Sequence, residues 1–169
     1  KKEPIKEQNK IRLDKTQIKS VEVSENISNV KAYDGSEPFI FVSYSHDDSK
    51  EVYHELEKLN KSNFLIWYDQ GIRASEKWGA KIVRKIKNCS AFVVFITHKS
   101  VKSENVINEI HLGLKYKKDR FIQIFLEDTD LPDELEYNLL RIQALLKYQM
   151  REDEFYVKLH EDLNMILKK

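Results

Sequence analysis

The feature of this sequence that most constrains its fold is an alternation, from residue 38 onward, between short apolar runs and amphipathic segments. The apolar runs cover residues 38–45, 63–69, 90–97, 120–127 and, more weakly, 144–149. Their nearly continuous hydrophobicity is typical of strands buried on both faces of a parallel sheet. The segments between them carry apolar residues at helical spacing, over residues 47–62, 76–89, 103–118, 131–143 and 152–169. We therefore predict an α/β fold of three layers, in which helices cover both faces of a five-stranded parallel sheet.

Residues 1–36 lack this alternation. They are rich in Lys, Glu, Asn and Ser, and their apolar residues are scattered. The turn-forming segment YDGSEP, residues 33–38, separates them from the first apolar run. We expect a polar leader over residues 1–36, which could be the end of an upstream module, and one domain over residues 37–169. Because the chain starts at Lys1 rather than at Met, we also expect a preceding part, where a sensor domain would lie.

Charge and composition exclude several classes of partner. The 29 basic and 28 acidic residues give a net charge of +1, so the chain as a whole is not built to bind nucleic acid or a membrane surface. A local basic patch stays open. The longest apolar run, residues 91–96, is far too short to span a membrane. The single cysteine, Cys89, excludes an internal disulfide and a cysteine metal cluster, and it suits a cytoplasmic location.

In parallel α/β sheets, ligands bind beyond the carboxyl ends of the strands, near the point where the strand order reverses. Functional residues are therefore expected just after Ser43, Asp69, Thr97 and Glu127, in the segments SYSHDDSK, DQGIRASEKW, THKSVKSEN and EDTDLP. In the first of these segments, the hydroxyls and Asp47 or Asp48 could also serve as caps for the following helix.

Several chemistries that such a fold supports are not encoded here. The chain has four glycines and neither GxGxxG nor GxxxxGK[ST], which disfavours a phosphate-binding loop. A phospho-receiver domain would need an aspartate at the end of the third strand, and a serine hydrolase would need GxSxG; both are missing. The five histidines have no metal-ligand spacing, so we predict no metal site and interpret each as a surface residue.

The segment 103–118 predicts an amphipathic helix with one carboxylate that needs an explanation. Ile107, Ile110 and Leu114 form the apolar stripe, and Ser103 can cap the helix start. Glu109 lies at the edge of this stripe, but the residues three and four positions away on either side are not basic. A solvated surface glutamate is the ordinary interpretation, and a functional carboxylate is the alternative.

Taken together, these motifs resemble a TIR domain of the bacterial type over residues 38–168. The resemblance rests on the order and spacing of FIFVSYSHDD, FLIWYDQGI, RASEKW, NCSAFVVFITHKSVKSENVINEI and IFLEDTDLPDELEYNLLRIQALLKY. It implies a flavodoxin-like sheet with the strand order 2-1-3-4-5. It also implies one of two functions, because many TIR domains are NAD⁺ glycohydrolases or cyclases, whereas others are adaptors that only associate with further TIR domains.

In the enzymes of this family, a glutamate on the helix after the third strand acts on the bond between nicotinamide and ribose, and the matching residue is Glu109. NAD⁺ is then the substrate, and no cofactor is expected. By the same resemblance, contacts with the substrate are expected from Ser43, Tyr44, Ser45, Asp69, Trp78, Ser103 and Asn105. Trp78 could equally pack in the core. Two departures are that Asn105 stands where active members often have an aromatic residue, and that Ala74 and Ser75 replace a frequent Pro-Gly pair.

The resemblance further implies homotypic assembly and a role in prokaryotic, antiviral immunity in the cytoplasm. In family enzymes the loop after the second strand, called the BB loop, completes the site of a neighbouring protomer. The corresponding residues are Gly71, Ile72, Arg73, Ala74 and Ser75. The adaptor alternative requires this loop but not Glu109. A fold like the nucleoside deoxyribosyltransferases, which also apply a glutamate to ribose, would not explain why SYSHDD and the BB loop occur together.

Overall fold

The computed structural model describes residues 29–70 and 76–168. Five parallel strands form one sheet in the order β2-β1-β3-β4-β5. The strand order reverses at β1, because the chain first moves outward to β2 and then crosses back to β3. The α/β fold and the strand order 2-1-3-4-5 predicted above are therefore confirmed. The strands are β1 Ile40–Ser43, β2 Ile66–Tyr68, β3 Ala91–Ile96, β4 Phe121–Phe125 and β5 Ala144–Leu146.

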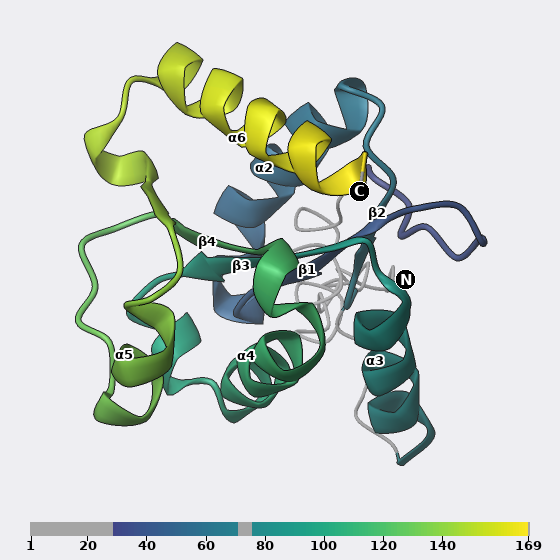
Figure 1. The fold of residues 1–169 in the computed structure, drawn as a ribbon, viewed down its shortest axis with the longest axis horizontal. Helices are drawn as coiled ribbons and strands as arrows, with labels where there is room; N and C mark the ends of the chain where they lie inside the picture. Colours follow the sequence, from purple (N-terminus) through teal and green to yellow (C-terminus); the bar gives the residue numbers. More distant parts are fainter. Residues whose placement is uncertain (1–28, 71–75, 169) are drawn as a thin grey trace, which may run out of the picture.

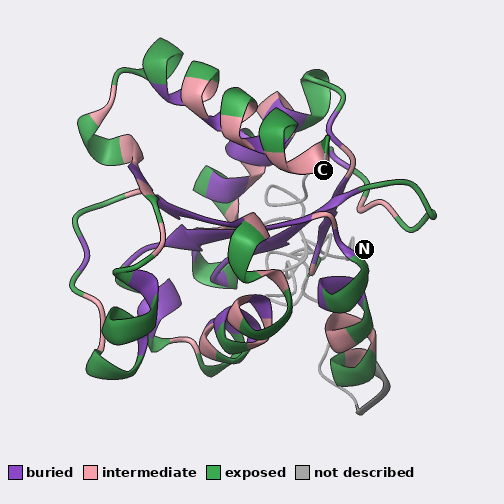
Figure 2. Cartoon of the chain, viewed as in Figure 1, coloured by how far each residue is buried: buried purple, intermediate pink, exposed green. Residues whose placement is uncertain are grey.

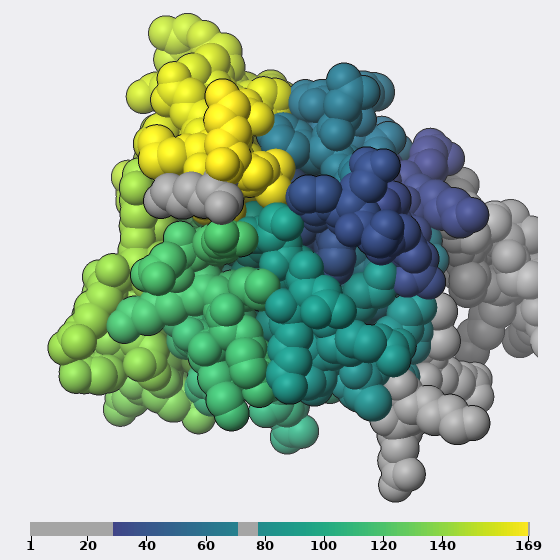
Figure 3. Space-filling model, turned by 45° about the vertical axis from the view of Figure 1, so that its right-hand side comes forward, coloured from purple at the N-terminus to yellow at the C-terminus, as the bar shows by residue number. Residues whose placement is uncertain are grey.

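In the described part of the chain, five α-helices cover the two faces of this sheet (Figure 1). Helices α2 and α6 pack on one face, whereas α3, α4 and α5 pack on the other. Figure 3 shows the same division on the surface, with α2 in blue next to α6 in yellow. The helices are α2 Ser49–Lys61, α3 Glu76–Asn88, α4 Glu104–Lys117, α5 Asp133–Leu139 and α6 Glu152–Leu167.

Strands β1 to β4 are buried along their whole length, as Figure 2 shows in purple, whereas in β5 only Leu145 is buried. Successive strand residues point into two different cores. Ile40 and Val42 of β1 face the α2 and α6 side, whereas Phe41 faces α3, α4 and α5. On this second side a row of stacked aromatic rings crosses four strands, with centroid distances of 5.0, 5.3 and 4.8 Å. The row consists of Trp67, Phe41, Phe92 and Phe121.

Packing starts before residue 37, which was the predicted start of the domain. Val30 is buried in the core beneath α2 and α6, and the Tyr33 amide donates a hydrogen bond of 2.7 Å to the Ile66 carbonyl of β2. The Tyr68 hydroxyl also donates to the Val30 carbonyl. Residues 30–33 are therefore part of the folded unit, because they supply hydrogen bonds to the otherwise exposed edge strand.

The end of α5 shows how the structure departs from the sequence pattern, which predicted a helix over residues 131–143. The helix ends at Leu139, and the buried Gln123 amide donates 2.8 Å hydrogen bonds to the carbonyls of Leu139 and Ile142. These bonds satisfy carbonyls that a continued helix would have used. The short 3₁₀ helices η2 His46–Asp48, η3 Ser100–Lys102, η4 Lys118–Arg120 and η5 Lys147–Gln149 were not predicted. None of the described helices combines the length and apolar character needed to cross a membrane.

Candidate active site

A cleft of about 490 Å³ opens at the carboxyl edge of the sheet, above β1 and its two neighbours β2 and β3. It is lined by the segments that follow these three strands and by the first turns of α4. This is the place expected for a ligand in a parallel sheet whose strand order reverses at β1. The fourth expected segment, after β4, contributes no residue to the cleft lining, although Glu127 accepts a 2.7 Å hydrogen bond from the amide of the lining residue His98.

Glu109 is the buried carboxyl group of this cleft. Its exposed fraction is 8%, and the Ser43 hydroxyl donates a 2.5 Å hydrogen bond to its Oε2 atom. Burial raises the pKa of Glu109 to about 8; the hydrogen bond from Ser43 lowers it, and the nearby Asp69 charge raises it. The interpretation of Glu109 as a solvated surface residue is therefore wrong. A pKa of about 8 means that this group is mostly protonated at neutral pH.

Helix α4 holds Glu109 at this position because of two local features. The Ser103 side chain accepts a hydrogen bond from the Val106 amide at 3.5 Å, so the predicted helix cap is confirmed. One turn after Glu109, Gly113 faces the aromatic row of the sheet. A Cβ atom there would lie 2.9 Å from ring carbons of Phe92 and Phe121, so only glycine lets α4 approach the sheet this closely.

Asp69, which directly follows β2, forms the second acidic position. Its Oδ2 atom lies 3.6 Å from His46 Nε2 and accepts a hydrogen bond of 3.3 Å from the Trp78 indole. The Tyr44 hydroxyl donates a 2.7 Å hydrogen bond to the Asp69 carbonyl, and burial raises the pKa of Tyr44 well above its usual range. These contacts tie the segments after β1 and β2 to the start of α3.

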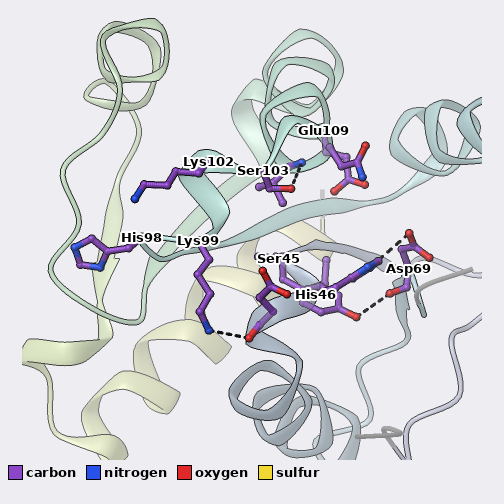
Figure 4. Close-up of a pocket in the computed structure, with 13 residues that line it drawn as sticks. Ser45, His46, Asp69, His98, Lys99, Lys102, Ser103 and Glu109 are labelled. Carbon is purple, nitrogen blue, oxygen red and sulfur yellow. Dashed lines mark hydrogen bonds and ion pairs between the residues drawn. The ribbon is translucent and has the colours of Figure 1, made fainter. Parts of the chain in front are cut away.

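Basic side chains gather at the other end of the cleft. Figure 4 shows Glu109 and Asp69 toward one end, and His98 and Lys102 toward the opposite end. Lys99 Nζ, on the same segment, lies 3.1 Å from Asp48 Oδ1. Glu109 and Asp69 thus lie at one end of the cleft, with His46 beside Asp69, whereas Lys99, Lys102 and His98 lie toward the other. At this second end Lys99 is paired with Asp48 and His98 with Glu127, so Lys102 is the cleft lysine there without an ion pair among the described residues.

The first loop is stabilised differently from the sequence expectation. Neither Asp47 nor Asp48 caps α2 or η2 through its side chain. Asp48 is instead buried and accepts a 2.6 Å hydrogen bond from the Thr97 hydroxyl at the end of β3. The prediction of a capping aspartate is wrong here, because the strand-end hydroxyl and Lys99 provide stronger partners than a helix amide.

The cleft brings together most of the residues proposed as substrate contacts, namely Tyr44, Ser45, Asp69, Ser103 and Asn105 with Glu109. Ser43 donates its hydroxyl hydrogen bond to Glu109. Trp78 is not among the cleft-lining residues; it packs on Trp67 with a centroid distance of 6.0 Å, and its indole donates a hydrogen bond to Asp69. The BB-loop residues 71–75 lie outside the described residues. Sequence reasoning missed His46, His98, Lys99 and Lys102, although the strand-end segments that it singled out contain all four.

Comparison with known proteins agrees with this architecture. The TIR domain of the Toll-related receptor TRR-2 from Hydra magnipapillata is similar, with a TM-score of 0.63 and 16% identity over 74% of this chain and 97% of that chain. The TIR domains of the activated Roq1 resistosome, which directly recognises the pathogen effector XopQ, match with a TM-score of 0.49 and 14% identity over 78% and 84% of the two chains. No match is found among curated proteins. The family model described as TIR domain matches residues 40–161, so this chain belongs to the TIR domain family.

Proposed function

We propose that this TIR domain cleaves NAD⁺ between nicotinamide and ribose, with Glu109 as the catalytic carboxylate. The observation that carries the proposal is a carboxyl group buried in the wall of a strand-end cleft, where its hydrogen-bond donor is a serine rather than a cation. Buried carboxyl groups with strongly raised pKa values are concentrated at functional sites. Ser43 contacts Oε2 of Glu109, and Glu109 also lines the cleft, where a ligand could contact its carboxyl group.

The chemistry requires little beyond this carboxylate. Nicotinamide is a positively charged leaving group that departs without protonation, and the transition state at the ribose resembles an oxocarbenium ion. An anion held next to the ribose stabilises the positive charge that develops there. Water then adds to the ribose to give ADP-ribose, or an internal nucleophile of the substrate gives a cyclic product.

The raised pKa of Glu109 fits a cationic substrate. The carboxyl is mostly protonated at neutral pH, because burial raises its pKa to about 8. A pyridinium ring bound beside it would attract the ionised form and lower this pKa. The substrate itself would thus generate the carboxylate, and the proton would leave to solvent.

The uneven charge distribution of the cleft supports a dinucleotide in one orientation. Nicotinamide would lie at the end formed by Glu109 and Asp69. The pyrophosphate, which carries two negative charges, would then lie toward Lys99 and Lys102. A neutral or purely cationic substrate would have no negative group to contact Lys99 and Lys102.

The proposal includes activation by self-association in a prokaryotic immune response in the cytoplasm. The residues proposed for the contact between protomers are those of the BB loop, 71–75, which follow Asp69 and Gln70 in the sequence. Clustering by an upstream sensor would then convert a weakly active domain into an active one.

The direct test is nicotinamide release from NAD⁺ by protein clustered on a support. Glu109→Gln keeps the size of the side chain but removes the negative charge, and we expect turnover to fall about a hundredfold or more. Glu104→Gln is the matched control, because Glu104 is an exposed glutamate on the same helix. Equal turnover in wild type and Glu109→Gln would exclude this catalytic role. No turnover in any clustered sample that still self-associates would indicate an adaptor.

A further inference from the structure

A second concave site lies between α4 and α5, on the face of the sheet that these helices cover. The two helices lie next to each other in Figure 1, and the same segments form the lower left of the surface in Figure 3. The groove has a volume of about 330 Å³ and shares no lining residue with the Glu109 cleft. Its lining residues are His111, Leu114, Lys115, Lys118, Tyr137, Asn138 and Arg141.

The charge of this groove is one-sided. Lys115, Lys118 and Arg141 line it together with His111, and no acidic residue is among its described lining residues. Some described lysines elsewhere are paired, and Lys58, Lys85, Lys147 and Lys158 each lie within 4.0 Å of a carboxylate. Among residues 29–70 and 76–168, the groove cations have no such ion pair. Asp119 follows Lys118 directly but lines a different groove, next to Phe121.

The basic side chains converge because of helical spacing. His111, Lys115 and Lys118 are four and three residues apart, so they lie on one face of α4 and its 3₁₀ extension. Arg141, which follows α5 by two residues, lines the groove with them. Converging positive charges repel one another, and a bound anion would offset this repulsion. The charge pattern therefore indicates an anionic ligand.

An aromatic side chain adds a second recognition element. Tyr137 has an exposed fraction of 66%, which is high for a large aromatic residue. Arg141 Nη2 donates a 3.0 Å hydrogen bond to the Tyr137 hydroxyl, and its guanidinium carbon lies 4.7 Å from the ring centroid. This contact holds the guanidinium at the groove and leaves the planar Tyr137 and Arg141 groups available for stacking with a base.

We propose that the groove between α4 and α5 binds a nucleoside phosphate. The phosphates lie against Lys115 and Lys118, the base stacks on the planar surface of Tyr137 and Arg141, and the Asn138 amide can donate or accept a hydrogen bond at the base or ribose. The volume fits a single nucleotide. The net charge of +1 gives no extended basic track for a nucleic-acid strand.

The test is calorimetric titration of the whole chain with ADP. We expect Lys118→Glu and Arg141→Glu each to weaken ADP binding at least tenfold, and Tyr137→Ala to weaken it about tenfold through lost stacking. Lys50→Glu is the matched control, because it changes the same charge at an exposed lysine of α2. Lys102→Glu reports on ADP bound in the other cleft. Both variants should leave the affinity of the α4 and α5 groove unchanged.

Three results would overturn this proposal. The first is ADP binding that Lys102→Glu abolishes and the groove variants leave intact, since the ligand would then lie in the Glu109 cleft. The second is pyrophosphate that binds as tightly as ADP, because the base would contribute nothing. The third is a single-stranded oligonucleotide of twelve bases that binds more tightly than ADP at physiological salt, which would indicate a nucleic-acid surface. None of these measurements depends on NAD⁺ turnover.

Discussion

Two buried glutamates, one on each side of the sheet, have opposite surroundings. Glu55 on α2 has an exposed fraction of 3%, and its carboxylate contacts Lys147 Nζ at 2.5 Å and the Tyr156 hydroxyl at 2.5 Å. Glu109 on α4 has an exposed fraction of 8%, and Ser43 is its hydrogen-bond donor. No lysine or arginine pairs with Glu109 among the described residues. One carboxyl group is thus neutralised by a cation and the other is not.

The difference separates a structural carboxylate from a functional one. A buried charge is tolerated when a counter-charge and hydrogen bonds replace water, which is the situation of Glu55. Glu109 lacks this compensation and stays protonated to about pH 8 in the folded protein. Its burial therefore lowers the free energy of unfolding at every pH at which Glu109 is ionised in the unfolded chain. A destabilising buried carboxyl group of this kind is typical of a functional site, and Glu109 lines a cleft.

The largest expected effect is a stabilisation of the protein by Glu109→Gln. Below pH 4.5 the carboxyl is protonated in both states, so its ionisation contributes nothing to stability. Between pH 4.5 and about 8 only the unfolded chain ionises, which lowers the free energy of unfolding by about 1.4 kcal/mol per pH unit. Glutamine has no such penalty, so the variant should be more stable by about 3 kcal/mol at pH 7. Urea unfolding at several pH values measures this difference.

The pH dependence of that difference is the sharper result. The advantage of Glu109→Gln should be close to zero at pH 4.5, grow steadily up to pH 8 and then stay constant. Glu104→Gln, which changes an exposed glutamate of the same helix, should show no such slope. A constant advantage from pH 5 to 8 would mean that Glu109 ionises normally, and the contrast with Glu55 would disappear.

The next effect has the opposite sign. Glu55→Gln removes the negative charge that neutralises Lys147, whose side chain is only 24% exposed. The ammonium group would stay largely out of water without a counter-charge, so we expect a loss of about 2 kcal/mol in the free energy of unfolding at pH 7. Urea unfolding measures it, and the double variant Glu55→Gln with Lys147→Met should recover part of the loss. Turnover per folded molecule should not change, because Glu55 lies on the other side of the sheet.

The strands and helices could be predicted almost completely from the sequence, for a physical reason, whereas the strand order followed only from the resemblance to TIR domains. Strands β1 to β4 are buried along their whole length, so each of them is a continuous apolar run in the sequence, whereas the partly buried β5 gives the weaker run. Each helix buries one face only, so its apolar residues recur at helical spacing. The predictions were wrong where individual side-chain contacts outweigh the pattern of apolar residues. Gln123 supplies hydrogen bonds at the end of α5, and Val30 joins the core although its neighbours are polar.

The site was predicted less well, because its contacts join residues that are distant in the chain. Helical spacing predicted that Glu109 lies at the edge of the apolar stripe. It could not predict the hydrogen bond to Ser43, because the two residues are 66 positions apart in the sequence. The pair of Glu55 and Lys147 spans 92 residues, and periodicity made Glu55 an ordinary helical residue. Helical spacing reports which face a residue occupies, whereas only the fold decides which partner it meets there.

The smallest expected effect comes from removing the Ser43 hydroxyl, which is the hydrogen-bond donor to Glu109. The hydrogen bond from Ser43 favours the carboxylate and lowers the pKa of Glu109, so Ser43→Ala should raise this pKa further. If the ionised form is the catalyst, the pH profile of nicotinamide release shifts to higher pH, and turnover at pH 7 falls about tenfold. Ser90→Ala is the matched control, because Ser90 directly precedes β3 and so lies at the edge of the sheet away from the cleft.

The shape of that profile separates two roles of Ser43. A hydroxyl that acts by stabilising the carboxylate matters only while Glu109 is partly protonated, so wild type and Ser43→Ala should converge at high pH. A hydroxyl that contacts the substrate would lower turnover by the same factor at every pH. Parallel profiles would therefore contradict the role of Ser43 as the group that stabilises the Glu109 carboxylate. They would mean that Glu109, which lacks the cation that pairs with Glu55, ionises without help from β1.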